Sequence, residues 1–233
     1  MTVSQLSLVE WLGIIAAILQ VVGYLYYMKF IKSGRIDPNP VTWFMLAYGT
    51  ALLTVLELDA TGSWAILALP AACAVCTLWV AAWCWKRARK IDDTRWWPKD
   101  WWPDNKSDQL SFISDAVITV GYFGCWYLAF SGILTEDWKL IFVLGFLWLA
   151  NISTVPAIMP LLRETREHPE KEYSTPWVVW TWAYVFLTAA TLLEEHESVS
   201  VFLALMAYPV INVALHALVA WWATKKITAS ASS

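Results

Sequence analysis

The sequence predicts an all-α membrane protein with seven transmembrane helices, built as two parallel three-helix repeats joined by a linker helix. Three observations predict this fold: apolar blocks of spanning length, basic residues confined to alternate connections, and motifs that recur at nearly one spacing. Of 233 residues, 59% are hydrophobic and 15% charged, whereas soluble domains average about 45–50% and about 25%. A net charge of −3 offers no basic surface for nucleic acid, so none is expected as a partner.

Apolar blocks about as long as a bilayer is thick define the seven elements. About 20 apolar residues in a helix cross the hydrocarbon core, and a helix satisfies its own backbone groups in lipid. The first block follows no positively charged segment and precedes Lys29 and Lys32 rather than a cleavage site, so it is a retained span and not a signal peptide. In order, the predicted spans are 8–28, 41–58, 64–85, 111–131, 140–162, 177–193 and 199–223.

The basic residues set the expected orientation. All but one of the 16 Lys and Arg residues fall in the connections after the first, third, fifth and seventh spans. The opposite connections hold Lys139 and several acidic residues, among them Glu57 and Glu194, which are expected to be solvated at the outer surface. Positive loops stay cytoplasmic. We therefore expect a multi-pass protein of the plasma (inner) membrane, with its N-terminus outside and its C-terminus in the cytoplasm.

Motifs recur between the first three and the last three spans. Matched prolines and tryptophans carry the comparison, because they are rarer than leucines in apolar helices. The matches are Trp11-Leu12 with Trp148-Leu149, Pro40 and Ala47-Tyr48 with Pro176 and Ala183-Tyr184, and Pro70, Val80-Ala81, Trp83 and Lys86 with Pro209, Val219-Ala220, Trp222 and Lys225. The predicted units are 1–90 as the first repeat, 91–135 as a Trp-rich cytoplasmic loop and linker helix, and 136–233 as the second repeat. Because three spans are an odd number, the linker makes the repeats parallel.

Two loop segments carry a resemblance to a known family. Gly34–Trp43 reads GRIDPNPVTW, while Thr154–Pro160 reads TVPAIMP and is followed by Tyr173–Trp177, YSTPW. With the 3+1+3 plan, the chain resembles the SWEET and PQ-loop (MtN3-like) transporter superfamily, and is most similar to uncharacterised bacterial seven-helix members. The resemblance implies alternating access around a site near the bilayer midplane, between the repeats.

The departures from that family bear on the solute. Val41 and Trp177 follow the loop prolines where the family has glutamine. Of the family's four hinge prolines, three are matched by Pro40, Pro160 and Pro176, while the first span offers Gly23 or Tyr24. Pro156 is a further bending point. Sugar specificity therefore does not carry over, and a vitamin precursor stays open, because related nicotinamide riboside transporters share the helix plan.

Polar residues near the middle of the spans are the candidate solute-binding groups, because polar side chains in lipid usually face the bundle interior. Tyr48 and Tyr184 occupy matched positions and are expected to face one another across a cavity. Asn212, with its repeat partner Cys73, and Asn151 complete the set. The alternative for each is packing, since a membrane Asn often only bonds a neighbouring helix, a contact worth about 1 kcal/mol or less.

Two ionisable residues are candidate proton sites. Asp115 lies about one turn inside the fourth span, and His216 lies one turn beyond Asn212 on the same helix face. An ionisable group inside a membrane marks a proton or ion path by default. The alternatives are that the Asp115 carboxylate reaches the aqueous interface and that His216 is a packing residue.

Tryptophan is unusually abundant, with 18 residues. Trp96, Trp97, Trp101 and Trp102 form a tandem motif and are expected to anchor the loop at the membrane surface, where an indole is buried while its N–H stays wet. Docking of a partner subunit is the alternative.

Other activities lack their motifs. The last span has no central lysine to hold retinal, and the C-x-x-C of Cys73 and Cys76 lies inside a span without a second pair, so no cofactor and no metal are expected. No nucleophile–base pair or phosphate-binding loop appears, so the chain is not expected to be an enzyme.

The sequence thus favours a facilitator or proton-coupled carrier of a small polar solute, such as a sugar or vitamin precursor. The alternative is a non-transporting membrane subunit that binds partner helices, lipids or a pigment through its Trp-rich surface. Expected partners are the lipid bilayer and the solute, with a second copy of the chain or other membrane subunits left open.

Overall fold

The computed structural model describes residues 6–36, 38, 40–91 and 105–230, and the described chain is all-α. Its elements, in order, are α1 (Leu8–Lys32), α2 (Pro40–Thr61), α3 (Trp64–Ile91), α4 (Lys106–Phe130), α5 (Glu136–Glu167), the short 3-10 helix η2 (Pro169–Lys171), α6 (Ser174–Leu193) and α7 (Val199–Ser230). Seven helices within the described ranges are long and apolar enough to cross a membrane. The predicted all-α class and seven spans are confirmed, and the chain is a multi-pass membrane protein.

The helices are longer than the predicted spans, most clearly at α5, which begins at Glu136 and ends at Glu167 rather than covering 140–162. Hydropathy marks only the part that lipid requires to be apolar, whereas backbone hydrogen bonding continues into charged residues. Caps fix two starts: the Ser7 hydroxyl accepts from the Glu10 amide, and Thr135 caps α5 through the Trp138 amide. Gly34 and Gly132, which follow α1 and α4, have positive φ values of 71° and 74°.

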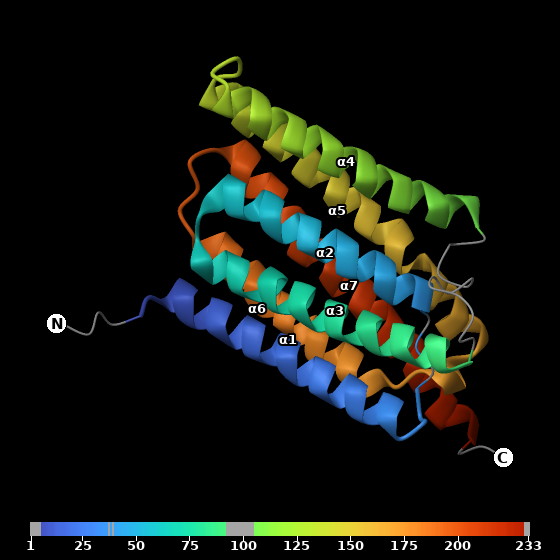
Figure 1. The fold of residues 1–233 in the computed structure, drawn as a ribbon. Coiled ribbons are helices and arrows are strands. Elements are labelled where there is room, and N and C mark those ends of the chain that lie inside the picture. Colours follow the sequence, from blue (N-terminus) through green and yellow to red (C-terminus); the bar gives the residue numbers. More distant parts are fainter. Residues whose placement is uncertain (1–5, 37, 39, 92–104, 231–233) are drawn as a thin grey trace.

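Successive helices run in opposite directions and form one bundle (Figure 1). This arrangement collects most basic side chains of the described chain at one end, where Glu164, Glu167, Glu170 and Glu172 also lie. At the basic end lie Lys29, Lys32, Arg35, Lys86, Arg87, Arg163, Arg166, Lys171 and Lys225; at the acidic end lie Glu10, Asp59, Glu136, Asp137, Glu194, Glu195 and Glu197, together with Lys139. These two groups of residues define the basic end and the acidic end of the bundle.

The helix contacts divide the bundle into two groups. α3 packs between α1 and α2, and α7 packs between α5 and α6. The groups meet along two further seams, α1 against α6 and α2 against α5. α4 lies at the edge of the bundle, against α5 and a part of α2 (Figure 1), and is the least buried of the seven spans.

The interior changes character along the bundle axis. Toward the basic end it is aromatic, with Tyr24, Tyr27, Trp43, Trp177 and Trp180 packed together. Toward the acidic end it is mainly aliphatic, with Leu52, Leu56, Ile66, Leu187 and Leu205 among its members. Membrane helices gain little from the hydrophobic effect between them, so close packing and buried hydrogen bonds hold such a core.

The seam between α1 and α3 depends on a glycine. A Cβ at Gly13 would lie 2.2 Å from the carbonyl oxygen of Ala65, so a side chain there would push the two backbones apart. Small residues permit this kind of close approach between membrane helices.

Gly13→Ala is therefore expected to destabilise the bundle, because overpacking of this kind costs about 1–3 kcal/mol. Thermal unfolding of the protein in mild detergent measures the effect. Gly124→Ala is the matched control, because a Cβ at that helical position meets nothing within 4 Å. Equal melting temperatures for the two variants would contradict the close approach.

Candidate functional site

A small enclosed cavity lies where the two helix groups meet, and its wall is here called the central cage. Among the described residues, each spanning helix except α4 contributes to it. Its lining residues are Tyr24, Trp43, Leu46, Thr50, Cys73, Thr77, Thr154, Ile158, Trp177, Trp180, Tyr184, Tyr208, Asn212 and His216. The volume of about 20 Å³ is room for one water molecule. In this conformation the cage is closed.

Helical spacing brings these residues to one place. Trp177, Trp180 and Tyr184 follow each other at intervals of three and four residues on α6, and Tyr208, Asn212 and His216 at intervals of four on α7. Residues three and four apart share one face of a helix. Each of these two helices therefore presents a stripe of polar and aromatic side chains to the cage.

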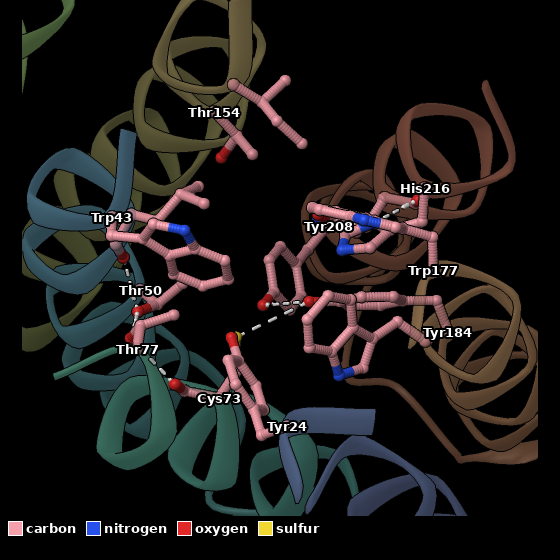
Figure 2. A pocket seen from close by; sticks show the side chains of 14 residues that line it. Tyr24, Trp43, Thr50, Cys73, Thr77, Thr154, Trp177, Tyr184, Tyr208 and His216 are labelled. Carbon is pink, nitrogen blue, oxygen red and sulfur yellow. Dashed lines mark hydrogen bonds between the residues drawn. The ribbon is translucent and has the colours of Figure 1, made fainter. Parts of the chain in front are cut away.

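The tyrosine hydroxyls converge on the Cys73 thiol. Tyr24 Oη lies 3.4 Å from Cys73 Sγ, and the Tyr184 hydroxyl donates to the same sulfur at 3.8 Å. Tyr184 and Tyr208 are joined through their hydroxyls at 3.0 Å. Figure 2 shows these groups meeting from three sides of the cage. A hydroxyl can donate and accept, so this cluster can rearrange around a polar guest.

Asn212 and His216 form the polar edge of the cage on α7. Asn212 Nδ2 donates to the Tyr208 carbonyl at 2.9 Å, and His216 Nδ1 lies 2.7 Å from the Asn212 carbonyl. Since a carbonyl oxygen only accepts, Nδ1 carries the hydrogen and Nε2 is the nitrogen left to accept in the neutral ring. The His216 ring packs against Trp177, Trp180 and Tyr184, with centroids 4.9 to 5.9 Å away.

Trp180 closes the cage against α1. Its indole Nε1 donates to the Gln20 carbonyl at 3.0 Å, and its ring occupies the space that a side chain at residue 23 would need. A Cβ at Gly23 would come within 2.3 Å of Trp180 Nε1. Gly23 therefore permits the close contact between α1 and α6.

On the side of the basic end, a buried carboxylate joins the two helix groups. Glu172, between η2 and α6, accepts from the Tyr27 hydroxyl of α1 at 3.1 Å and from Trp177 Nε1 of α6 at 3.0 Å. Trp43 of α2 donates to the same tyrosine oxygen at 3.2 Å. Glu172 is only 3% exposed, and burial raises its pKa to about 7 even though both indole and phenol donors favour the charged form.

Four of the residues predicted from the sequence line the cage: Cys73, Tyr184, Asn212 and His216. Tyr48 and Asn151 do not. The Tyr48 hydroxyl lies 2.6 Å from Thr119 Oγ1 on α4, so Tyr48 and Tyr184 do not face one another. Asn151 Nδ2 donates to the Ala204 carbonyl of α7 at 3.2 Å and bridges two helices.

The two acidic residues singled out in the spans are both buried. Asp115 is 3% exposed and hydrogen-bonds with Ser153 of α5, so its carboxylate is not at an aqueous surface. The expectation that Glu57 is solvated is wrong, because it is 1% exposed within α2; Glu194 is partly exposed. The helix α2 continues to Thr61, so Glu57 lies within it, next to the core residue Leu56, where neighbouring helices cover its side chain.

The candidate hinge prolines fall into two kinds. Pro156 and Pro160 lie inside α5, where each removes a backbone hydrogen bond. Pro40 begins α2 and Pro176 lies in the first turn of α6, where a missing amide hydrogen disrupts no helical bond. The tandem tryptophans Trp96, Trp97, Trp101 and Trp102 lie outside the described residues.

A salt bridge ties the helices together at the acidic end. Lys139 Nζ on α5 lies 2.9 Å from Asp59 Oδ1 on α2, and the Tyr122 hydroxyl of α4 donates to Asp59 Oδ2 at 3.3 Å. A surface hollow of about 400 Å³ lies beside them, lined among others by Glu136, Asp137 and Glu197. In the described part of the chain, no group of three or more His, Cys, Asp or Glu side chains could hold a metal ion.

The sequence did not point to much of the cage wall, namely Tyr24, Trp43, Thr50, Thr77, Thr154, Trp177, Trp180 and Tyr208. It also gave no sign of the buried Glu172, on the side of the cage toward the basic end. The three-and-four spacing of the aromatic residues in the sixth and seventh spans was a usable signal. Glu172 gave none, because a glutamate in a charged loop is ordinarily solvated.

Glu172→Gln is expected to remove a pH dependence of stability. Because folding raises the pKa of the Glu172 carboxyl from 4.5 to about 7, this carboxyl binds its proton more tightly in the folded protein than in the unfolded chain. The resulting stabilisation is complete below the unfolded pKa and is lost as the pH rises through about 7, a difference of about 3 kcal/mol. The melting temperature in detergent should therefore fall from about pH 5 to about pH 8 more steeply for the wild type than for the variant. Glu170→Gln, an exposed neighbour, should keep the wild-type slope; identical slopes in all three proteins would contradict the assignment.

Comparisons with models of protein families, with curated proteins and with solved structures find no match to this chain. Any function must therefore be argued from the geometry described above.

Proposed function

We propose that the chain is a membrane transporter that binds a small polar solute in the central cage and exposes it alternately to the two sides of the membrane. One observation carries the proposal: three tyrosine hydroxyls, a thiol, an amide and an imidazole are buried together at the meeting of the two helix groups. Polar groups are costly inside a membrane protein, and their convergence in one cavity is typical of a binding site.

We also propose that the two helix groups are parallel repeats, α1–α3 and α5–α7, linked by α4. The helix contacts support this, since exchanging α1 with α5, α2 with α6 and α3 with α7 turns every major seam among these six helices into another observed seam. The α1–α6 contact becomes the α2–α5 contact, and each group keeps its third helix in the middle. The recurring motifs Pro70 and Pro209, or Ala47-Tyr48 and Ala183-Tyr184, agree with the same exchange.

Alternating access in this scheme needs a barrier on each side of the cage. The layer of Trp43, Tyr27, Glu172 and Trp177 closes it toward the basic end. Aliphatic side chains such as Leu56, Ile66 and Leu187 close it toward the acidic end. The present cavity holds one water, so a solute enters only when the helix groups part at one of these barriers.

The prolines are placed to serve such a movement. Pro156 lies two residues beyond the cage residue Thr154 on α5, and Pro209 directly follows Tyr208 on α7. A bend at either proline would shift a cage side chain without unfolding the helix. Pro160 lies one turn beyond Pro156, and Pro40 and Pro176 mark the loops where α2 and α6 begin.

The charge distribution supports an orientation with the basic end in the cytoplasm, which places the N-terminus outside. The proposed 3+1+3 plan is also that of the SWEET and PQ-loop superfamily. We include membership of that superfamily in the proposal, on the loop segments given above and the paired helix contacts.

A second candidate function is a non-transporting membrane subunit. The observation that favours it is the closed cage, whose aromatic side chains leave space for only one water. Such a subunit would offer its exposed aromatic and aliphatic surface to partner helices, lipids or a pigment. Its mass in mild detergent, combined with an absorbance scan for a bound chromophore, distinguishes this candidate from a transporter.

Uptake into liposomes tests the transport proposal, with radiolabelled glucose, sucrose and nicotinamide riboside as probes. Tyr184→Phe and Asn212→Ala are expected to lower the uptake rate about tenfold, because each removes a hydrogen bond worth about 1–1.5 kcal/mol. Tyr127→Phe is the control, since Tyr127 is 66% exposed on the outer face of α4. Normal uptake by both cage variants would refute the site, and no uptake of any probe by the wild type would refute transport of these solutes.

A further inference from the structure

Asp115 is a buried acid outside the central cage. It lies on α4, the only spanning helix that contributes nothing to the cage wall, and faces the seam between α2 and α5. Asp115 lines a small cavity in this seam, together with Met45, Gly49, Thr50, Ala150, Ser153 and Ala157, among others. Only 3% of the residue is exposed.

The groups around Asp115 are neutral. The Ser153 hydroxyl donates to Asp115 Oδ1. Asp115 Oδ2 faces the backbone of Gly49, where an added Cβ would lie 3.4 Å from that oxygen. Tyr48, the titratable side chain that faces this site from α2, donates to the Asp115 carbonyl and not to its carboxylate. No hydrogen bond or ion pair of Asp115 within the described part of the chain is with Lys, Arg or His. A buried carboxylate without a cation is strongly disfavoured, so this group is suited to hold a proton.

The small cavity lined by Asp115 lies next to the cage. Its volume is about 10 Å³, at the lower limit of what holds a water. Leu46, Thr50 and Thr154 line both this cavity and the cage. Beyond it, Thr50 Oγ1 lies 3.1 Å from Thr77 Oγ1, and Thr77 donates to the carbonyl of the cage residue Cys73 at 2.8 Å. Hydroxyls at 3.1 Å can pass a proton along, because each is both donor and acceptor.

We propose that Asp115 is the proton carrier of this protein and that Thr50 and Thr154 couple it to the central cage. The proposal rests on the transport function proposed above and makes that transport proton-coupled. The O–H bond of the Asp115 carboxyl forms with a proton from water on one side of the membrane and breaks when the proton leaves to water on the other side. Between these events the acid stays neutral in the closed bundle.

This arrangement gives α4 a role in transport. The acid on α4 lies against α5 at Ser153 and against α2 at Gly49. The same two helices carry the residues shared with the cage, Thr154 on α5 and Thr50 on α2. When the helix groups part, the α2–α5 seam changes, and with it the access of water to Asp115. Glu57 is also buried, but it lines neither the cage nor the small cavity beside Asp115.

Two readouts test the proposal on the purified full-length chain. Infrared difference spectra across a pH titration should contain the C=O stretch of a protonated carboxyl. One carboxyl band should be absent in Asp115→Asn and shifted in Ser153→Ala, which removes the hydrogen bond to Oδ1. The same band should be retained in Glu57→Gln and in Glu172→Gln, which removes the carboxyl with a pKa of about 7. If Asp115→Asn removes no band, or if its band is instead lost in Glu57→Gln, the assignment is overturned.

The second readout is accumulation in liposomes of whichever of the three probes the wild type takes up, with a pH gradient imposed in each direction. One pH unit drives about tenfold accumulation for each coupled proton. Asp115→Asn should bring the ratio to about one while retaining solute exchange without a gradient, which also shows that the variant is folded. Full gradient-driven accumulation in Asp115→Asn would refute its role alone, whereas no uptake by the wild type would refute transport and coupling together.

Discussion

The contact of the Trp180 indole with α1 determines much of the rest of this structure. The ring lies where Gly23 has no side chain and donates to the Gln20 carbonyl, so it sets how closely α6 approaches α1. That approach brings Tyr24 within ring contact of Trp180, with centroids 4.7 Å apart, and places Tyr24 and Tyr184 on the same cysteine. The size of the cage thus follows from one indole lying over one glycine. Aromatic pairs of this kind add stability beyond the area they bury, which makes the seam stable as well as close.

The interior of the bundle combines tight packing with an unusual number of polar groups. In lipid, a polar side chain cannot be satisfied by solvent, so each must find a partner within the protein. Most of the threonines solve this locally by donating to a carbonyl one turn back on their own helix, as Thr77, Thr181 and Thr188 do. The tyrosines of the cage instead form hydrogen bonds across helices, Tyr184 with Tyr208 and both Tyr24 and Tyr184 with Cys73. A set of hydroxyls bonded in this way can exchange those bonds for bonds to a guest, because each hydroxyl both donates and accepts.

Three acids, Asp115, Glu57 and Glu172, are buried at different depths of the same bundle. They differ in their partners. Glu172 lies outside the spans and accepts from two aromatic donors, Asp115 has a serine hydroxyl, and Glu57 Oε2 has no hydrogen-bond partner in the structure. Such acids are costly to bury in the charged form. Glu172 and Asp115 lie on different seams, Glu172 between α1 and α6 and Asp115 between α4 and α5.

The sequence by itself determined the number and order of the helices, because a bilayer fixes the length of an apolar span and the alternation of charge fixes which connections share an end. Four of the residues that it singled out, Cys73, Tyr184, Asn212 and His216, line the cage, and polar residues at mid-span are rare enough to stand out. The sequence did not determine their partners. Tyr48 occupies the position in α2 that matches Tyr184 in α6, yet the two face different surroundings, because α4 packs beside α2 and takes up the Tyr48 hydroxyl. The burial of Glu57 and Glu172 was likewise decided by tertiary contacts. A glutamate near the end of a span is solvated or buried according to whether a neighbouring helix covers it. Hydropathy along the sequence carries no information about that neighbour.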